Sequence, residues 1–410
     1  HALNNTPRMK FSFDGKQLLL IRAGDTGAEE SWLLPWPAGS GTPRRILSTL
    51  PHDGTPDFDW MPDNRHIMAA TANGTGATPH LVLADTRSNG WQQITQGTQS
   101  EKTPSVAPDG RSILFAESDM DYDILSMSLA DGTTTPLIVT SRSEYHPAWA
   151  ARADSMVYVS ERLGTQDIWL HTKDGPDRPL VTRASFPSDP PQWLFGPTLS
   201  PDGTRVIFAA MTTTGQCWLW EVAVSGGAPV RLLNASESSK LQYAGEWSPD
   251  GRQFAFVADE PDGEASLKVV RTSGGAVAQR LADAMERVPS WSPDGKFIAY
   301  IDSKFAWHLI SPDGKDHRDL ATINAVNLGF SKDGKTAYGI RLDDSKFFLF
   351  SLDIGTGKVH DIKQLDRSLK PDSPLNPGIR FSLSPDGKSF AYSIYKQESS
   401  LWMLQGFAGK

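Results

Sequence analysis

A short turn motif recurs along the 410-residue sequence and constrains the fold more than any other feature. Residues 247–251 and 291–295 are both Trp-Ser-Pro-Asp-Gly, and residues 383–387 are Leu-Ser-Pro-Asp-Gly. Proline fixes φ at the first central position of a turn, aspartate bonds the backbone ahead of it, and glycine adopts the positive φ that follows. Because each copy continues into a hydrophobic strand, the motif predicts the first hairpin of a repeated all-β unit.

The hydrophobic residue before each turn, here called the anchor, marks nine repeats that are spaced 39 to 53 residues apart. That spacing is the length of one four-stranded propeller blade, and a propeller gains length without gaining domains. The fourth repeat has Ala-Arg-Ala-Asp at residues 151–154, yet its aromatic residues Trp149 and Tyr158 keep the nine-residue separation seen elsewhere. The nine anchors are Phe11, Trp60, Val106, Trp149, Leu199, Trp247, Trp291, Phe330 and Leu383.

We therefore predict an all-β chain in which residues 1–410 form a single closed β-propeller of four-stranded antiparallel blades. Nine blades follow from nine anchors, with eight as the alternative if one repeat is merged into a neighbour. Closure of a propeller removes the exposed edges of its sheets by completing the last blade with a strand from the other terminus. The sequence ends too soon after Leu404 to supply a last outer strand, so we expect residues 1–3 to supply it.

Composition excludes several classes of function. The net charge of −8, from 48 acidic and 40 basic residues, argues against the clustered positive surface that nucleic acid requires. Cys217 is the only cysteine, which excludes a disulfide within the chain and a cysteine-rich zinc site. No apolar run reaches 18 residues, so we predict no membrane span. Because the sequence starts at His1 and not at Met, we expect the natural start to lie upstream.

The recurring x-Pro-x-Trp-Ser-Pro-Asp-Gly-Lys pattern resembles the repeat of the TolB-type, WD40-like β-propeller family and of prolyl-oligopeptidase-type propeller domains, over residues 7–404. The resemblance implies a non-catalytic binding, sensing or protein-interaction role. The chain would be the C-terminal domain of a larger bacterial regulator or receptor, or a TolB-like partner in the cell envelope. The resemblance favours a location in the cell envelope or periplasm, with the cytoplasm as the alternative location. Related repeats also build metal-dependent lyases, so a metal-dependent enzyme with its site in the central funnel is the alternative function.

Motifs that suggest chemistry have simpler explanations within the repeat. Residues 329–336 match the spacing of a phosphate-binding loop, but they are the turn of the eighth repeat and lead into a strand where such a loop needs a helix. Residues 119–123, Asp-Met-Asp-Tyr-Asp, alternate carboxylates as a calcium loop does but lack its glycine and glutamate, which predicts a solvated hairpin tip. No zinc-type histidine spacing and no Gly-x-Ser-x-Gly elbow occur, so we predict no catalytic residue, metal or cofactor.

Residues just before each inner strand are predicted to converge on the central channel, where a rigid ring can hold a ligand. In the repeat alignment they include Arg8, Asp57, Lys102, Thr103, Tyr145, His146, Arg287, Asn327 and Arg380. Their mixed charge and aromatic rings suit a protein or peptide segment or a small polar ligand; the alternative is that they only hold ordered water. Trp193 lies in the connecting segment 186–195 and does not align with any conserved position of the repeat. We predict that it is a further binding residue on the rim of the channel. The candidate binding residues are Tyr145, His146, Trp193, Arg287 and Arg380. We expect the chain to be a monomer.

Overall fold

The computed structural model describes residues 8–23, 29–51, 57–72, 78–97, 99–186, 188–212, 214–233, 241–272, 277–285, 287–325, 327–344, 346–365 and 382–406. Their regular structure is β-strand, apart from the short 3₁₀ helix η1 (Arg183–Ser185). The prediction of an all-β chain with several four-stranded antiparallel sheets is confirmed. In the described part of the chain, no helix is long and apolar enough to cross a membrane.

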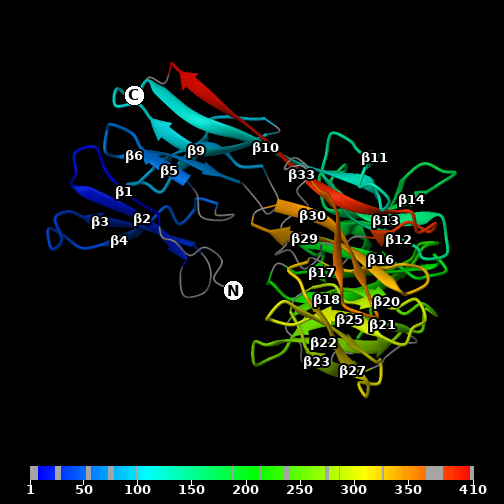
Figure 1. Ribbon diagram of the computed structural model, residues 1–410. Helices are drawn as coiled ribbons and strands as arrows, with labels where there is room; N and C mark the ends of the chain where they lie inside the picture. Colours follow the sequence, from blue (N-terminus) through cyan, green and yellow to red (C-terminus); the bar gives the residue numbers. More distant parts are fainter. Residues whose placement is uncertain are drawn as a thin grey trace. The chain divides into compact units, whose positions relative to one another are not determined.

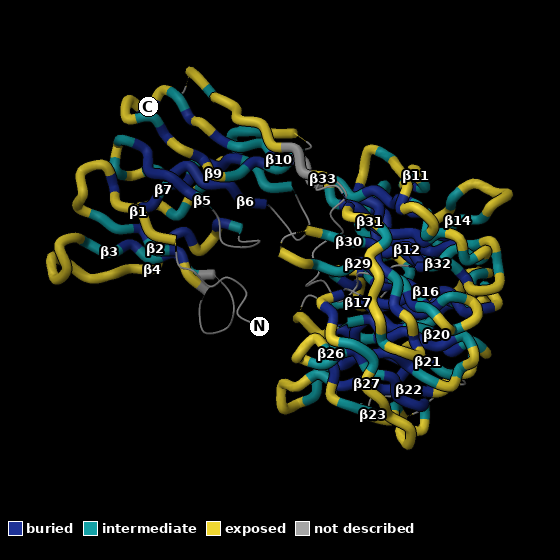
Figure 2. The backbone as a smooth tube through the Cα atoms, in the orientation of Figure 1, coloured by how far each residue is buried: buried dark blue, intermediate teal, exposed yellow. Residues whose placement is uncertain are grey.

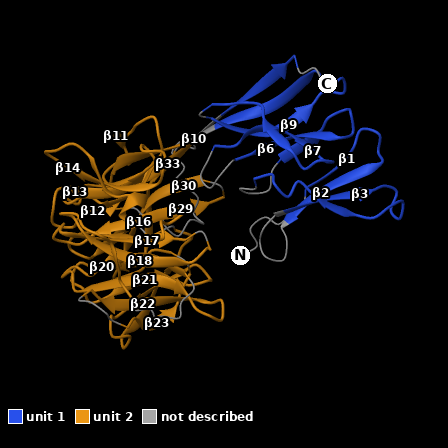
Figure 3. Cartoon of the chain, turned by 180° about the vertical axis from the view of Figure 1, so that it is seen from behind, with its two compact units in different colours: residues 1–120, 397–410 blue, residues 121–396 orange. Residues whose placement is uncertain are grey.

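Contacts within the chain gather in two compact units (Figures 1 and 3). Unit 1 consists of residues 1–120 and 397–410, and unit 2 consists of residues 121–396. The single propeller domain over residues 1–410 and the count of nine blades stay predictions. The predicted closing strand at residues 1–3 lies outside the described residues.

Unit 1 contains two four-stranded antiparallel sheets and part of a third sheet. The first sheet has the order β1 (Arg8–Phe11), β2 (Gln17–Ala23), β3 (Glu29–Pro35) and β4 (Arg44–Ile46). The second has the order β5 (Asp57–Trp60), β6 (His66–Thr71), β7 (His80–Asp85) and β8 (Trp91–Gln93). Two long strands, β10 (Ser112–Ser128) and β33 (Ser389–Gln405), each run from one unit into the other, and β9 (Ser100–Val106) pairs with the unit 1 part of β10.

Unit 2 holds the remaining strands, grouped repeat by repeat. Repeat 4 forms β12 (Glu144–Trp149), β13 (Ser155–Ser160), β14 (Asp167–Thr172) and β15 (Arg178–Val181). Repeat 5 forms β16 (Trp193–Leu199), β17 (Arg205–Met211), β18 (Cys217–Ala223) and β19 (Val230–Arg231). Repeat 6 forms β20 (Leu241–Trp247), β21 (Gln253–Asp259), β22 (Ala265–Arg271) and β23 (Gln279–Asp283). Repeat 7 forms β24 (Ser290–Trp291), β25 (Ile298–Ile301), β26 (Ala306–Ile310) and β27 (His317–Thr322). Repeat 8 forms β28 (Gly329–Phe330), β29 (Thr336–Asp343), β30 (Lys346–Asp353) and β31 (Val359–Gln364).

The third and ninth repeats contribute to one sheet. Its order is β11 (Thr134–Ile138), β10, β33 and β32 (Ser382–Leu383), and β9 also pairs with β10. The solvated hairpin tip predicted at residues 119–123 is wrong, because β10 passes through these residues as one strand. Asp123 is fully buried there and forms an ion pair with Lys396 of β33. A buried carboxylate that pairs with a cation does not need the solvent exposure that a hairpin tip provides.

All nine anchors occupy the last position of the first strand of their repeat. Each one pairs with the residue seven positions later, as in Trp247 with Phe254 and Leu383 with Phe390. Repeat 4 keeps this register, with Trp149 opposite Met156, although its turn has lost proline and glycine. The register therefore depends on the pattern of inward-facing residues as well as on the turn.

The chemistry predicted for the turn is present in the sixth repeat. The Ser248 hydroxyl donates to Asp250 Oδ1 at 2.6 Å, and the same oxygen accepts the Arg252 N–H at 3.0 Å. The Gly251 N–H donates to the Ser248 carbonyl at 2.8 Å, and Gly251 has φ +73°. This positive φ is strained for residues with a Cβ, which explains the glycine.

Six apolar cores lie between neighbouring sheets of unit 2, and buried segments fill its interior (Figure 2). One core packs Ile340 of repeat 8 against Phe390 of β33, and another packs Met156 of repeat 4 against Ile124 of β10. The first strands follow the order β12, β16, β20, β24, β28 and β32, and β32 contacts β12 again. The sheet shared by repeats 3 and 9 thus lies between the sheets of repeats 8 and 4.

Hydrogen bonds beside the anchors join neighbouring repeats. In three repeats the indole N–H of the anchor donates to a carbonyl one residue before the previous anchor: Trp60 to Lys10 at 2.9 Å, Trp247 to Thr198 at 3.2 Å, and Trp291 to Glu246 at 3.1 Å. Buried indole N–H groups need such an acceptor. The tryptophan of the motif therefore connects neighbouring blades by a hydrogen bond.

A second bond, here called the clasp, runs from the backbone N–H of an anchor to a side chain of the neighbouring repeat. Val106 donates to Asp59 Oδ2 at 2.9 Å, and Trp291 donates to Glu246 Oε2 at 3.0 Å. Trp149 donates to Ser382 Oγ at 2.8 Å. In each case the acceptor stands one residue before an anchor. The ninth repeat thus makes with the fourth repeat the bond that consecutive repeats make elsewhere.

Candidate functional site

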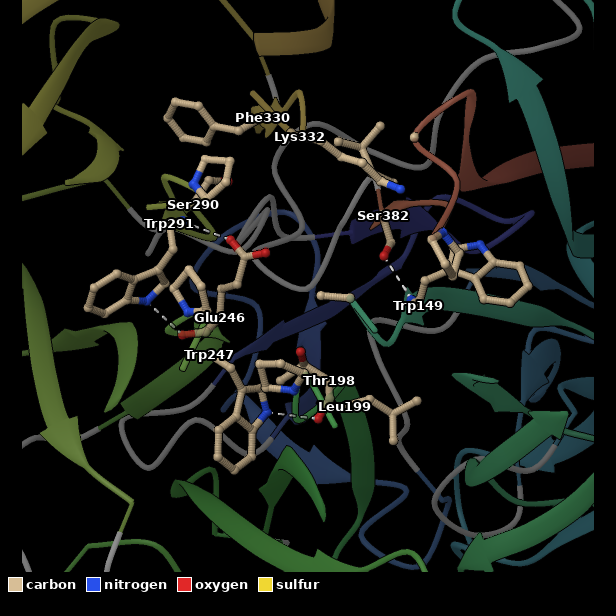
Figure 4. A pocket seen from close by; sticks show the side chains of 18 of the residues that line it. Trp149, Thr198, Leu199, Glu246, Trp247, Ser290, Trp291, Phe330, Lys332 and Ser382 are labelled. Atoms are coloured by element: carbon tan, nitrogen blue, oxygen red, sulfur yellow. Dashed lines mark hydrogen bonds between the residues drawn. The ribbon is translucent and has the colours of Figure 1, made fainter. Parts of the chain in front are cut away.

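A pocket of about 330 Å³ lies at the ends of the first strands of unit 2. All six anchors of this unit line it: Trp149, Leu199, Trp247, Trp291, Phe330 and Leu383. The turn prolines contribute further apolar surface: Pro201, Pro249, Pro293 and Pro385. The repeat motif therefore builds the wall of the pocket as well as the blades. Figure 4 shows the labelled side chains around a hollow centre, with Trp149 and Ser382 opposite Trp291 and Phe330.

The aromatic wall is held rigidly. Trp247 is 4% exposed, and its ring packs under the guanidinium of Arg205, 4.7 Å from the ring centroid, and edge-on against Phe254. Trp291 and Phe330 are also buried. Cation–π contacts and indole hydrogen bonds limit the orientations of such rings. A concave, largely apolar surface with few fixed polar groups is the usual form of a small-molecule site.

Three polar side chains of the pocket lining hold backbone groups of neighbouring repeats. The Ser290 hydroxyl donates to the Leu328 carbonyl, and the Ser382 hydroxyl accepts the Trp149 N–H. Glu246 accepts the Trp291 N–H through Oε2. The described lining residues include no histidine and no cysteine. The lining thus offers apolar surface and fixed hydrogen-bonding groups, and it offers no side chain whose usual pKa is near neutrality.

Two cations line the pocket at positions where the repeat normally has other residues. Lys332 stands at the turn position that is proline in most repeats, and Arg152 stands at the position that is aspartate. The Arg152 N–H donates to the Pro201 carbonyl at 3.0 Å, and its Nη2 donates to the Pro249 carbonyl at 3.0 Å. Arg152 therefore contacts the turns of the next two repeats at the mouth of the pocket.

The structure brings together two of the predicted binding residues. Tyr145 and His146 are buried in β12 with their rings edge to face, 4.9 Å apart. The His146 N–H donates to Ser393 Oγ at 3.0 Å, and its Nδ1 accepts the Gly196 N–H at 3.3 Å. His146 thus connects the sheets on either side of its own, with φ +55° at a bulge in the first strand. These bonds position the blades around the histidine.

The other candidates lie apart from this pair. Trp193 begins β16 and is 41% exposed, and Arg287 is half-buried before β24. Arg380 lies outside the described residues. None of the four described candidates lines the pocket, whereas Asn327, from the wider set of channel residues, does. Their binding roles stay predictions.

A carboxylate cluster occupies the start of the unit 2 segment of β10. Burial, together with the charges of Asp123 and Glu144, raises the pKa of Asp121 to about 6. Lys396 pairs with Asp123, and Arg162 Nε donates to Glu144 at 3.1 Å, so cations offset part of this charge. In the described residues, no three His, Cys, Asp or Glu side chains are grouped so that they could hold a metal ion. Burial also raises the pKa of the Cys217 thiol to about 12, which keeps it protonated.

Sequence reasoning identified the anchors but gave them only a structural role. It placed the binding residues near the beginnings of the first strands, while the pocket lies at their ends. The signal that could have located it is the loss of the turn consensus at Arg152 and Lys332. A residue that differs from the consensus of its repeat does not serve the structural role that the consensus residue has in the other repeats.

Comparison with known proteins gives a fold. No family model matches the chain, and no curated protein matches it. The putative TolB of Agrobacterium tumefaciens is similar over 68% of this chain and 99% of its own, with 19% identity and a TM-score of 0.52. TolB from Acinetobacter baumannii is similar over 80% of this chain and 79% of its own, with 14% identity and a TM-score of 0.44. A puromycin-hydrolysing peptidase of Mycobacterium tuberculosis is similar over 94% of this chain and 57% of its own, with 15% identity and a TM-score of 0.43. The repeated sheets and the likeness to the Agrobacterium protein show that this chain has a TolB-like β-propeller fold.

Proposed function

We propose that this chain is a non-catalytic binding domain and that the pocket lined by the six anchors of unit 2 is its ligand site. The observation that carries the proposal is the convergence of six rigid, mostly apolar anchors on one cavity of about 330 Å³. A volume of this size lies at the lower end of the range for small-molecule sites, roughly 300 to 1,000 Å³. The ligand would be a small molecule or one side chain of a peptide segment.

The hydrogen bonds of the lining support binding over catalysis. General acid–base catalysis needs a group whose pKa lies near the working pH and that reaches the substrate. In the pocket, Ser290, Ser382 and Glu246 each hold a backbone group of the next repeat. These bonds fix the positions of the three groups, which suits a site of fixed shape.

The first test is to fill the pocket. Leu383 is half-buried, and tryptophan is the anchor in three other repeats of unit 2, so Leu383→Trp suits the repeat while reducing the cavity. A library of one-ring and two-ring aromatic fragments is screened against the intact chain by ligand-observed NMR. We expect binders to the native protein that are lost in Leu383→Trp. The matched control is Leu163→Trp, at an exposed turn of unit 2 outside the pocket, which should keep them.

Two results would contradict the proposal. One is a set of fragments whose binding survives Leu383→Trp in a protein with native circular dichroism. The other is stoichiometric manganese or zinc in the purified protein that is lost in His146→Ala, since it would favour the metal-dependent enzyme.

A further inference from the structure

We infer that the pocket is selective for a small aromatic carboxylate, whose ring packs among the anchors and whose carboxylate binds Arg152. The inference rests on the proposed function, because it names the class of ligand for the same site. It comes from the two places in unit 2 where the turn consensus is lost and a cation lines the cavity.

Among the described residues, the charge of Arg152 has no acidic partner. In the described part of the chain no carboxylate lies within ion-pair distance of its guanidinium, and its one side-chain hydrogen bond goes to the neutral Pro249 carbonyl. A guanidinium has five N–H donors, so this bond leaves most of them free to bind an anion. The backbone of Arg152 is also fixed by its bond to the Pro201 carbonyl. The cation is therefore held at the mouth by two neighbouring turns.

We expect Lys332 to contribute less than Arg152 to binding the anion. The pKa of Asp386 is lowered chiefly by hydrogen bonds from the Ser384 hydroxyl and the Lys388 N–H, and the charge of Lys332 lowers it further. A carboxylate of the chain therefore already lies near Lys332. Its stem lies against Gly387, where an added Cβ would meet Lys332 Cε at 3.4 Å. Lys332 thus adds positive potential, whereas Arg152 supplies the directed hydrogen bonds.

The charge of the lining is unusual for this chain. Arg152, Lys332 and Glu246 are its charged residues, which sum to +1, while the whole chain carries −8. The Glu246 carboxylate faces the Trp291 N–H, so the pocket's negative group is used internally. The rings of Trp247, Trp291 and Phe330 form part of the same lining. An aromatic ring with one carboxylate matches both the wall and the mouth.

The test compares two probes of the same shape, 1-naphthaleneacetate and its neutral amide, by isothermal titration with the intact chain. We expect the acid to bind about ten-fold more tightly than the amide, as charge-assisted hydrogen bonds are stronger than neutral ones. The preference should shrink when NaCl is raised from 50 to 500 mM. Arg152→Gln should abolish the preference and leave binding of the amide unchanged. Arg252→Gln, an exposed turn residue outside the pocket, is the matched control and should keep it.

Each outcome separates the two proposals. Equal binding of acid and amide, both lost in Leu383→Trp, overturns the carboxylate and leaves the binding function standing. A preference for the acid that survives Arg152→Gln overturns the role of Arg152. Binding of neither probe overturns the ligand class, and the fragment screen then decides the binding function separately. Native circular dichroism of Arg152→Gln shows that a lost preference does not reflect unfolding.

Discussion

The same anchor position is buried in most repeats of unit 2 and half-exposed in repeat 1 of unit 1. Trp247 and Trp291 are 4% and 6% exposed, while Phe11, the anchor of repeat 1, is 45% exposed in a first strand whose four residues are all exposed. Trp60, with β1 packed beside its repeat, is fully buried. The turn motif varies among these repeats, with Phe-Ser-Phe-Asp-Gly in repeat 1 and Trp-Met-Pro-Asp-Asn in repeat 2, and the buried anchors are those with a sheet packed beside them. In repeat architectures, each unit completes its core only against its neighbours.

The largest expected effect comes from a buried anchor of unit 2. Trp247→Ala removes a ring that packs against Arg205 and Phe254 and leaves the Thr198 carbonyl without its donor. We expect a loss of about 3–5 kcal/mol in the free energy of unfolding, as for other buried aromatic residues. Urea denaturation followed by circular dichroism measures it. A loss below about 1 kcal/mol would mean that the blades do not depend on their anchors.

The clasp predicts the next largest effect. Ser382→Ala leaves the Trp149 N–H without its acceptor, which should cost about 1–3 kcal/mol if that group stays buried. Ser105 stands at the same position of repeat 3 but is exposed, so Ser105→Ala should change the unfolding free energy by less than about 0.5 kcal/mol. Equal losses in the two variants, measured by urea denaturation, would show that repeat 9 has no special place beside repeat 4.

Two aspartates should give opposite pH dependences. The raised pKa of Asp121 means that the folded state of unit 2 holds its proton between about pH 4 and 6 while the unfolded state loses it, so stability falls as pH rises through this window. In unit 1 the Arg65 guanidinium, with backbone and Ser88 bonds, holds the pKa of Asp85 well below its usual range, so its contribution is present above about pH 4 and is lost on acidification.

We therefore expect Asp121→Asn to gain stability relative to the native chain between pH 4 and 7, and Asp85→Asn to lose it. Each change should be about 1 kcal/mol or less, because both sites are partly solvated. Urea denaturation at pH 4, 5.5 and 7 measures the two slopes. Slopes of the same sign would contradict the assignment of opposite environments.

The smallest expected effect tests the comparison itself. Phe11→Ala should change the free energy of unfolding by no more than about 0.5 kcal/mol, because Phe11 is half-exposed and its ring meets Trp36 only edge-on at 5.3 Å. A loss as large as that of Trp247→Ala would mean that another sheet covers β1 in solution. Such a result would support the predicted ring of nine blades.

Local features of the fold could be predicted because they depend on nearby residues. The turn chemistry and the pairing of each anchor with the residue seven positions on follow from short-range sterics and hydrogen bonding. Even repeat 4 is predicted correctly, because Trp149 and Tyr158 keep their spacing. The hairpin tip predicted at residues 119–123 is wrong, because residues that suit a turn also fit a strand when a cation such as Lys396 pairs with the buried Asp123.

The sequence by itself determined that this chain folds into repeated antiparallel hairpins, because turn residues and alternating apolar residues act over a few positions. Only the tertiary structure decided which repeats are neighbours, since the clasp between Ser382 and Trp149 joins residues 233 positions apart. The same long-range packing brings Arg152 and six anchors around one cavity. No local pattern encodes that convergence, because it arises from the order in which the sheets close on one another.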